Sequence, residues 1–429
     1  MKKMEFSLNK MKKSLREVHL EVIEAVKDIR LLNYCSWPTE IEQSFLGAYA
    51  KGNIKKISFD YEERDFSENK RALKKLLSPL SSENPLHIYT SKTIESYIHT
   101  IDMISSIGSS HFQELGIEVY GTPSVLQFGR NFSHLDMAKK ILKIYDEFDH
   151  AYLKESDLCF SSQLIVEDLK KRSQEVLGPD TPEFIEEPSI ISKAAAGMSR
   201  VRIRKGTCFS EYDFDQLFVH EVMTHSLTAI NGAAQENLPL LARGAPRTTK
   251  TQEGLATFAE VITGSMDIFR LRRLALRIVG IDMALKGADF YDLFKFFMSY
   301  GQNEKESFLS ASRILRGGYA EGGIVFTKDN VYLEGLFMVH SFFLWSLHTS
   351  NLSCIHTLFS GRLDIEDIFL LKGQYEKGQL KEPKYLPQWY KQINLLVGKI
   401  SFSLILDNLN FEEIDSYYGS LQSKYQSEV

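Results

Sequence analysis

The stretch that decides the fold is RVRIRKGTCFSEYDFDQLFVHEVMTHSLTAING, residues 200–232. At its start, Val201 and Ile203 alternate with arginines, which is typical of a strand with one buried face. We expect this strand, residues 200–205, to lie at the edge of a small sheet, where an extended peptide could pair with it. The stretch therefore predicts a strand followed closely by a helix.

The helix is predicted to begin after Ser210. Asp213, three residues later, completes an approximate capping box with this serine. The helix is expected to run to about Ile230, because Asn231 and Gly232 favour a C-terminal cap.

His220, Glu221 and His225 lie in the middle of this helix. Zinc peptidases usually carry HExxH, with histidines four residues apart, whereas these two are five apart. In a regular α-helix, residues five apart differ in direction by about 140°, so the two imidazoles could not reach one ion. A π-type turn would bring them into line, and we predict one between Phe218 and His225.

A third ligand is expected in TQEGLATFAE, residues 251–260. The pattern predicts a helix that places Glu253 and Glu260 on one face. Two carboxylates on an apolar helical face are costly unless they are paired or bind a metal. We therefore expect one Zn²⁺ per chain, bound by His220, His225 and Glu253, with Glu260 behind as a hydrogen-bond partner of a ligand.

Two histidines and one carboxylate leave a fourth position for water, as a catalytic zinc site requires. Glu221, beside a ligand, is then the expected general base that activates this water and passes the proton to the leaving amine. The alternative makes His220 and His225 histidines of the core and Glu221 a surface charge.

With both HEVMTH (220–225) and TQEGLA (251–256) present, the sequence resembles the QEGLA-motif zinc metallopeptidases. This group includes the microtubule-associated tyrosine carboxypeptidase and bacterial relatives labelled flavohemoglobin expression-modulating proteins. The similarity includes the motifs VYGTP (119–123), NGAAQ (231–235), GAP (244–246), RILRGG (313–318) and FTKDNVYLEG (326–335).

The resemblance implies the same roles that the residues suggest by themselves. The family's histidine ligands fall on His220 and His225, its catalytic glutamate on Glu221 and its glutamate ligand on Glu253. It also implies cleavage of a C-terminal residue, with a preference for an aromatic one.

A carboxypeptidase needs a cation for the terminal carboxylate, and the planar fork of arginine suits this best. Arg316 in RILRGG is the first candidate and Lys328 in FTKDN the second. Arg202 and Arg204 on the predicted strand are weaker candidates. Tyr332 is the candidate donor to the developing oxyanion, with a buried structural tyrosine as the alternative.

The fold class is predicted to be α+β and predominantly α, a zincin-like metallopeptidase with a small β-sheet. The polar residues 78–85 separate an N-terminal helical segment, residues 1–85, from a zincin-like domain, residues 86–429. Helices are predicted within 11–32, 67–80, 91–107, 134–149 and 250–300, the last broken at Gly264, Gly280 and Gly287. Short strands are predicted at 55–61 and in 116–124, before its Gly and Pro turn.

Two further sets of residues are given structural roles. RLRRLALR (270–277) is interpreted as a charged face above buried leucine and alanine, rather than as a phosphate or acidic-tail site. The four cysteines form no C-x-x-C pair and are expected to be small buried side chains, without a disulfide framework.

Composition limits the partners and the location. The net charge of -5 over 429 residues provides no basic field for nucleic acid. No apolar segment follows the N-terminal lysines, and the apolar stretch 335–347 is too short to span a bilayer. We expect a cytoplasmic protein without a membrane span, with delivery elsewhere by a route that needs no N-terminal signal left open.

The sequence thus predicts a zinc metallocarboxypeptidase acting on the C-terminus of a peptide or protein. A zinc endopeptidase or amidase is the first alternative, and a cleft open at both ends would favour it. A regulatory or binding protein with a structural metal is the second, and a fourth protein ligand would favour it.

Overall fold

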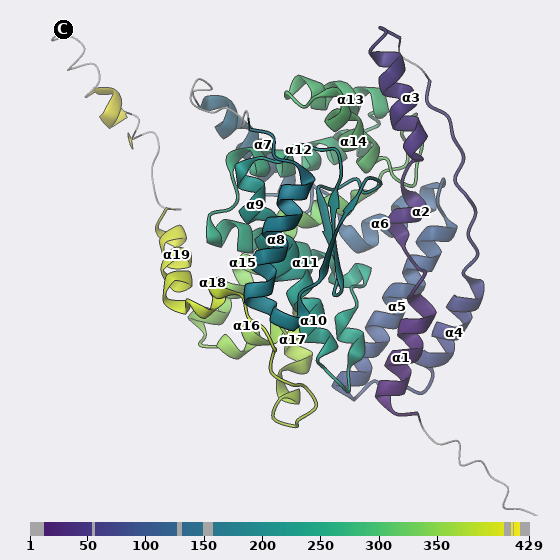
Figure 1. Ribbon diagram of the computed structural model, residues 1–429, viewed down its shortest axis with the longest axis vertical. Helices are drawn as coiled ribbons and strands as arrows, with labels where there is room; N and C mark the ends of the chain where they lie inside the picture. The colour runs from purple at the N-terminus through teal and green to yellow at the C-terminus, as the bar shows by residue number, and fades with distance from the viewer. Residues whose placement is uncertain are drawn as a thin grey trace, which may run out of the picture. The chain divides into compact units, whose positions relative to one another are not determined.

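Helices make up most of this computed structural model, with a three-stranded sheet among them (Figure 1). The structure describes residues 13–53, 56–126, 131–148, 158–406, 413–414 and 416–420. Two compact units are present, residues 1–386 and 387–429. The predicted division at residues 85 and 86 stays a prediction.

The helices of the first unit up to the sheet are α1 Leu15–Val26, α2 Leu31–Cys35, α3 Thr39–Tyr49, α4 Ser67–Leu77, α5 Pro85–Ser105, α6 Ser110–Tyr120, α7 His134–Glu147 and α8 Ser162–Leu177. Those that follow the sheet are α9 Glu211–Leu217, α10 Leu227–Ala233, α11 Thr249–Thr263, α12 Ile268–Leu285, α13 Phe290–Ser299, α14 Glu304–Ile314, α15 Val331–His348, α16 Leu352–Leu358 and α17 Ile365–Leu371. The second unit contains α18 Gln388–Lys391 and α19 Ile393–Leu406.

The sheet consists of β1 Glu183–Glu187, β2 Ala194–Ala196 and β3 Arg200–Arg204. Its order is β1-β3-β2, with β1 parallel and β2 antiparallel to β3. The strand predicted at 200–205 is confirmed, but the prediction that it forms an edge is wrong. β3 is central because both neighbours pair with it, so the edge strands are β1 and β2, and of these two β2 lines the large cleft.

The alternating pattern gives β3 one buried face, as expected. Val201 and Ile203 are fully buried and belong to the cluster that joins the sheet to α8 and α9. The arginines between them therefore face the other side of the sheet. Arg200, Arg202 and Arg204 line the same cleft as the two histidines.

α11 and α15 pack tightly through two glycines (Figure 1). A Cβ atom on Gly254 would lie 2.3 Å from backbone atoms of Gly335, well inside any real contact. The glycine of the QEGLA motif is thus required by the close approach of two backbones. This contact fixes where the carboxylate of Glu253, the preceding residue, lies.

Gly254→Ala is expected to lower the free energy of unfolding by about 1–3 kcal/mol, because the two helices must separate. The matched control is Gly47→Ala in α3, where an added Cβ would meet no atom within 4 Å. There, the better helix propensity of alanine should leave stability equal or slightly higher. Urea unfolding of both variants would measure the difference, and equal stability would contradict the packing argument.

Other helix predictions are confirmed with corrected ends. α9 begins with the predicted capping box of Ser210 and Asp213. α10 continues past Gly232 to Ala233, because this glycine packs against the backbone of Leu241 instead of ending the helix.

Gly264 and Gly287 follow helix ends with positive φ, as predicted. Gly280 lies within α12 and does not break it, contrary to the prediction. It allows α12 to approach the side chain of Ile314 in α14 closely, since a Cβ on Gly280 would lie 2.7 Å from Cδ1 of Ile314.

Two predicted strands are wrong. The residues from 116 to 120 end α6, which stops at Gly121 with a φ of 69°. The described residues of the other stretch, 56–61, form no strand. Their alternating side chains instead pack on aromatic rings, with Phe59 5.3 Å from Trp37.

The prediction of four unpaired cysteines is also wrong. Cys159 and Cys208 form a disulfide that ties the segment before α8 to the loop before α9. The adjacent Phe160 and Phe209 form a β-bridge, so backbone pairing brings the two cysteines together. The other two, Cys35 and Cys354, are free and buried, as expected.

Within the described residues, every helix is too short or too polar to cross a lipid bilayer.

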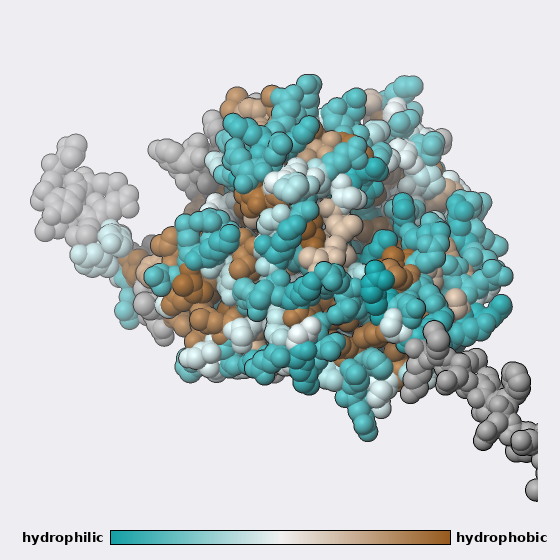
Figure 2. Space-filling view, turned by 60° about the horizontal axis from the view of Figure 1, so that its bottom comes forward, coloured by the Kyte–Doolittle hydropathy of each residue, from teal (hydrophilic) through white to brown (hydrophobic). Residues whose placement is uncertain are grey.

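One face of the molecule is mostly hydrophilic, with smaller hydrophobic areas between the polar side chains (Figure 2).

Candidate active site and metal centre

A π-helical turn separates α9 from α10, as the histidine spacing predicts. It spans Phe218–Ser226, and the hydroxyl of Thr224 donates to the carbonyl of Val219, five residues earlier, at 3.0 Å. The wider turn brings the ring centroids of His220 and His225 to 4.9 Å. Both imidazoles therefore face the same side of the helix, which a regular α-helix would prevent.

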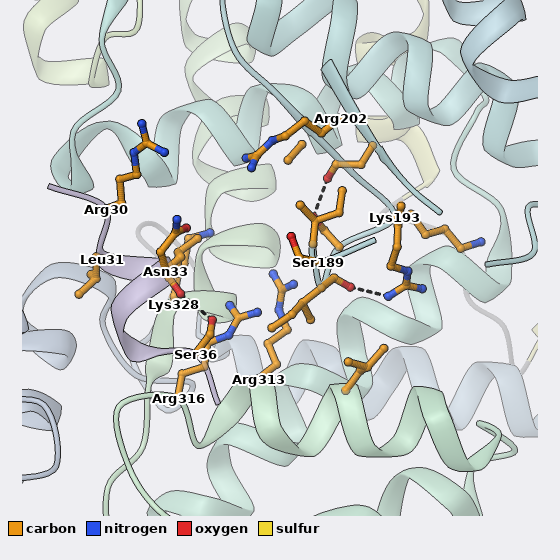
Figure 3. Close-up of a pocket in the computed structure, with 18 of the residues that line it drawn as sticks. Arg30, Leu31, Asn33, Ser36, Ser189, Lys193, Arg202, Arg313, Arg316 and Lys328 are labelled. Atoms are coloured by element: carbon orange, nitrogen blue, oxygen red, sulfur yellow. Dashed lines mark hydrogen bonds between the residues drawn. The ribbon is translucent and has the colours of Figure 1, made fainter. Parts of the chain in front are cut away.

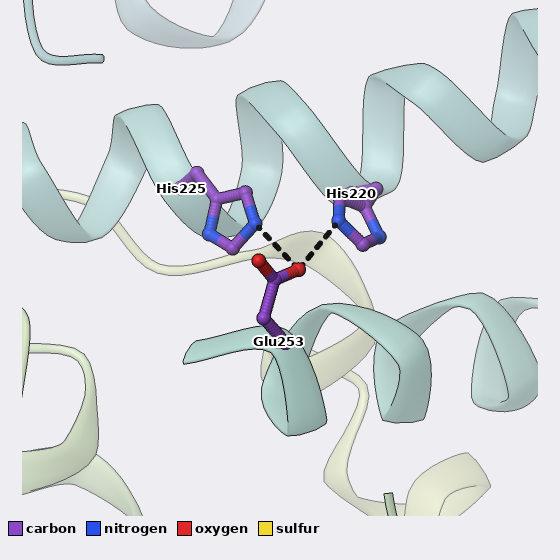
Figure 4. Close-up of side chains that lie close together, drawn as sticks. All are labelled: His220, His225 and Glu253. Atoms are coloured by element: carbon purple, nitrogen blue, oxygen red, sulfur yellow. Dashed lines mark ion pairs between the residues drawn. The ribbon is translucent and has the colours of Figure 1, made fainter. Parts of the chain in front are cut away.

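Glu253 of α11 points between these two imidazoles (Figure 4). Its Oε2 lies 3.4 Å from Nε2 of His220 and 3.7 Å from Nε2 of His225. The three donor atoms lie within 4.8 Å of one another. Donors at zinc–ligand distances of about 2.0–2.2 Å in a tetrahedron are separated by roughly 3.4 Å, so the arrangement fits a zinc ion.

The charges of the three residues also suit a cation. Burial lowers the pKa of His220, but its bonds with Glu253 and Glu260 outweigh this and raise it to about 10. Burial raises the pKa of Glu253, but Lys328 and the two histidines hold it well below its usual range. The buried carboxylates thus attract positive charge, which a proton or a metal ion can supply.

Glu260 lies behind His220, where the sequence placed it. Its Oε1 is 2.6 Å from Nδ1 of His220 and accepts from Nε2 of Gln216 at 3.0 Å. Arg270 donates to both of its oxygens, each at 3.1 Å. Burial raises the pKa of Glu260, but Arg270 and His220 outweigh it and lower the pKa to about 2. The carboxylate therefore stays ionised and directs Nε2 of His220 toward Glu253.

Glu260→Gln is expected to weaken metal binding by about 10–100-fold, because the neutral amide orients the imidazole poorly. It also leaves Arg270 buried without a carboxylate, so unfolding should need less denaturant. Competition with a chelator would measure the affinity. Glu304→Gln, at an exposed position of α14, is the control, and equal affinities of the two variants would contradict a role for Glu260.

Glu221 lies beside the three donors and lines a large cleft of about 1560 Å³. Its carboxylate forms no hydrogen bond or ion pair with any residue in the described part of the chain. A buried carboxylate without a partner, 8% exposed, is open to water in the cleft. This is the position that a general base requires.

The cleft is strongly cationic (Figure 3). Lysine and arginine outnumber aspartate and glutamate in its lining by about two to one, although the whole chain carries a net charge of -5. Arg270, Arg273 and Arg277 of α12 all line it. Leu274 and Ala275 are buried beneath the charged residues, as predicted, but the three- and four-residue spacing of these arginines turns them into the cleft.

Most of these cations are already paired. Lys328 lies 3.3 Å from Oε1 of Glu253, so it neutralises the carboxylate of the donor cluster. Arg313 forms an ion pair with Asp329, whose Oδ2 also lies 3.7 Å from Nε of Arg277. Arg204 donates to the carbonyl of Ile191 and to Thr207.

Arg316 is different from these cations. It is 4% exposed and its Nε has no hydrogen-bond partner. It forms no ion pair with any residue that the structure describes. Burial and the neighbouring Arg313 lower its pKa to about 10. A buried guanidinium that lines the cleft and has no ion-pair partner among the described residues is suited to bind an anion.

Arg202 and Tyr332 also line the cleft. Arg202 lies on the cationic face of β3, opposite Arg316 and Arg313 in Figure 3. Tyr332 is 8% exposed, and its hydroxyl accepts from Nη2 of Arg313 at 3.3 Å. This bond leaves the hydroxyl proton of Tyr332 available for a group in the cleft.

Arg362 is a residue of the site that the sequence did not indicate. Its Nη2 donates to the carbonyl of His225 at 3.2 Å and to that of Ala196 at 3.4 Å. The hydroxyl of Ser226 donates a further hydrogen bond to the carbonyl of Gly197, at 2.9 Å. The end of β2 is thus held against the π-helical turn. No motif around Arg362 signals this role, because its partners are backbone carbonyls distant in sequence.

The family model described as Microtubule-associated tyrosine carboxypeptidase matches residues 49–408. The chain belongs to this family. The comparison with curated proteins gave no match. Among solved structures, the chain is similar to one described as a lipoprotein from Colwellia psychrerythraea, with 13% identity over 86% of this chain and 69% of that chain and a TM-score of 0.40.

Membership of the microtubule-associated tyrosine carboxypeptidase family confirms the resemblance that the motifs indicated. The family is one of carboxypeptidases, so the carboxypeptidase part of the prediction is supported. All predicted site residues lie within the matched range. α1, α2 and most of α3 precede it, although α2 lines the same cleft.

Proposed function

We propose that this protein is a zinc-dependent carboxypeptidase that removes one residue from the C-terminus of a peptide or protein. The observation that carries the proposal is a single cleft lined by both His220, His225 and Glu253 and the unpaired, buried Arg316. The first group suits a metal that activates water. The guanidinium suits the free carboxylate that only a chain end provides.

The proposed cofactor is one Zn²⁺ per chain, held by the two Nε2 atoms and by the carboxylate of Glu253. When bound, zinc supplies Lewis acidity at the scissile carbonyl and makes water nucleophilic near neutral pH. Among the described residues, three side chains offer donors to this ion, so a position remains for water, which argues against a closed structural site. A zincin-like arrangement is also part of the proposal, supported by the small sheet beside the histidine-bearing helix.

Glu221 is proposed as the general base. Its unpartnered carboxylate takes a proton from the attacking water and then gives it to the leaving amine. Arg362 holds the backbone of His225 and so fixes the turn on which Glu221 lies. The low exposure of Glu221 limits competing solvent and keeps the proton near the reacting atoms.

Two other groups act on the substrate. Arg316 holds the terminal carboxylate, and its planar fork sets the distance from the chain end to the scissile bond. Tyr332 donates a hydrogen bond to the oxygen that becomes negative in the tetrahedral intermediate. Arg313 favours this donation, because it already supplies the hydrogen bond that the tyrosine oxygen accepts.

The excess of cations in the cleft favours an acidic segment upstream of the scissile bond. A preference for a terminal tyrosine or phenylalanine rests on the family name alone. The absence of nucleic acid partners stays a prediction. The cytoplasmic location also stays one, and the Cys159–Cys208 disulfide instead favours an oxidising compartment.

The decisive test measures metal per chain and residues released from peptides by the purified protein. Peptides that differ in the last residue, each with a free and an amidated C-terminus, form the substrates. One zinc per chain and release only from free ends would support the proposal. Cleavage of amidated peptides at the same rate would favour an endopeptidase or amidase, and absence of bound metal would contradict the mechanism.

A further inference from the structure

One wall of the cleft comes from the N-terminal part of the chain. Residues 31–37, called here the N-terminal wall, comprise α2 and the two residues after it. Leu31, Asn33 and Ser36 line the cleft close to Arg316 and Lys328 (Figure 3). This wall precedes residue 49, where the match to the carboxypeptidase family begins. It is therefore a feature of this chain that the family match does not include.

The N-terminal wall is bonded directly to the loop that carries Arg316. The N–H of Gly317 donates to the carbonyl of Cys35 at 2.8 Å. Nε1 of Trp37 donates to the carbonyls of Leu315 at 3.2 Å and Gly318 at 3.1 Å. These bonds reach the residues on both sides of Arg316, so the wall and the guanidinium are held as one unit.

Aromatic packing supports the same unit. The ring of Trp37 lies 5.3 Å from Phe290 and 6.2 Å from Phe308, both buried. The hydroxyl of Tyr61 donates to the carbonyl of Gly318 at 2.8 Å and lies 3.3 Å from that of Cys35. Such buried contacts make the N-terminal wall a fixed boundary of the cleft.

We propose that the N-terminal wall closes the cleft beyond Arg316 and limits the size of the terminal side chain. The inference rests on the proposed function, in which Arg316 holds the terminal carboxylate. A chain that continued past this carboxylate would meet Ser36 and Trp37, which line the cleft. Only a chain end fits, so the wall makes the enzyme an exopeptidase rather than an endopeptidase.

Ser36 is the residue on which to test this inference. It follows Cys35, the residue bonded to Gly317, and its small, half-buried side chain lines the cleft. Ser36→Trp would fill the space beside Arg316. Glu40→Trp is the matched control, because Glu40 is exposed on α3 and is not among the residues lining the cleft.

The test is done by binding, so that it does not depend on hydrolysis. Both substitutions are placed in the zinc-loaded Glu221→Gln protein, and Kd is measured for peptides of one sequence ending in glycine, leucine or phenylalanine. Ser36→Trp should weaken binding of the phenylalanine peptide at least tenfold more than that of the glycine peptide. The Glu40→Trp control should change neither.

An equal effect of Ser36→Trp on all three peptides, or none, would overturn the inference, as would failure of every peptide to bind. A failure of the proposed function is distinguishable, because unmutated protein would then release no residue while selective binding persisted.

Trp37→Phe gives a second test, since phenylalanine keeps an aromatic ring and removes the two hydrogen bonds of Nε1. It should raise the affinity for a peptide whose C-terminal carboxyl carries an N-butylamide relative to the same peptide with a primary amide, and an unchanged ratio would overturn the inference.

Discussion

Glu221→Gln is expected to lower kcat by about 10²–10⁴-fold, because the amide cannot accept a proton from the attacking water. The side chain is nearly the same size and has no partner among the described residues to lose, so the fold should be unaffected. Zinc content should also stay at one per chain, since the three donors are untouched. Steady-state kinetics and metal analysis on one preparation would measure both effects.

The matched control is Glu211→Gln, which removes the same charge from the exposed first turn of α9. It should leave kcat and KM unchanged. Full activity of Glu221→Gln with bound zinc would show that another group is the base. Loss of zinc together with activity would instead assign Glu221 a role in holding the metal site.

Arg316→Met is expected to lower kcat/KM for peptides with a free C-terminus by about 10²-fold or more, because the terminal carboxylate loses its charged partner. The same substitution should raise the thermal midpoint of the ligand-free protein. Arg316 is buried and forms no ion pair with a described residue, so a methionine there removes a desolvation cost that Asp329 offsets only at longer range. Higher stability with lower activity distinguishes a binding residue from a structural one.

Arg316→Lys should have a kcat/KM between that of Arg316→Met and that of the unmutated protein, because lysine keeps the charge and loses the planar fork. Arg71→Met, at an exposed position of α4, is the control and should change neither property. The critical measurement is the ratio of kcat/KM for the free peptide to kcat/KM for the amidated peptide. If Arg316→Met still prefers free ends as strongly as the unmutated protein, another cation holds the carboxylate.

The candidate metal centre could be predicted from sequence because its residues are constrained locally. A spacing of five between His220 and His225 allows a common target only with a wider helical turn, and the structure contains that turn. Glu253 and Glu260 are seven apart in a helix and share a face, so one reaches the imidazoles from the front and the other from behind. Helix geometry determines the directions of the two imidazoles and the shared face of the two glutamates, and the packing of α11 brings that face to His220.

The errors have a common physical cause. Gly232 and Gly280 resemble helix ends in sequence, but each one is required by a backbone or side chain from another element. β3 alternates like a strand with one exposed side, but it lies between β1 and β2, and the short segments that form them pair with it only in the folded chain. The disulfide joins cysteines 49 residues apart that only the pairing of Phe160 with Phe209 brings together.

The sequence by itself therefore determined the chemistry of the donor residues, the π-helical turn and the mainly helical class, since each depends on periodicity within one segment. Tertiary structure alone decided which of the three buried arginines Arg316, Arg313 and Arg277 lacks an ion pair with a described residue. Arg316, Arg313 and Arg277 are equivalent by residue type, and the difference between them is the single carboxylate of Asp329. Charge pairing and burial are properties of the whole fold, so the anion site and the N-terminal wall beside it appear only when distant segments are brought together.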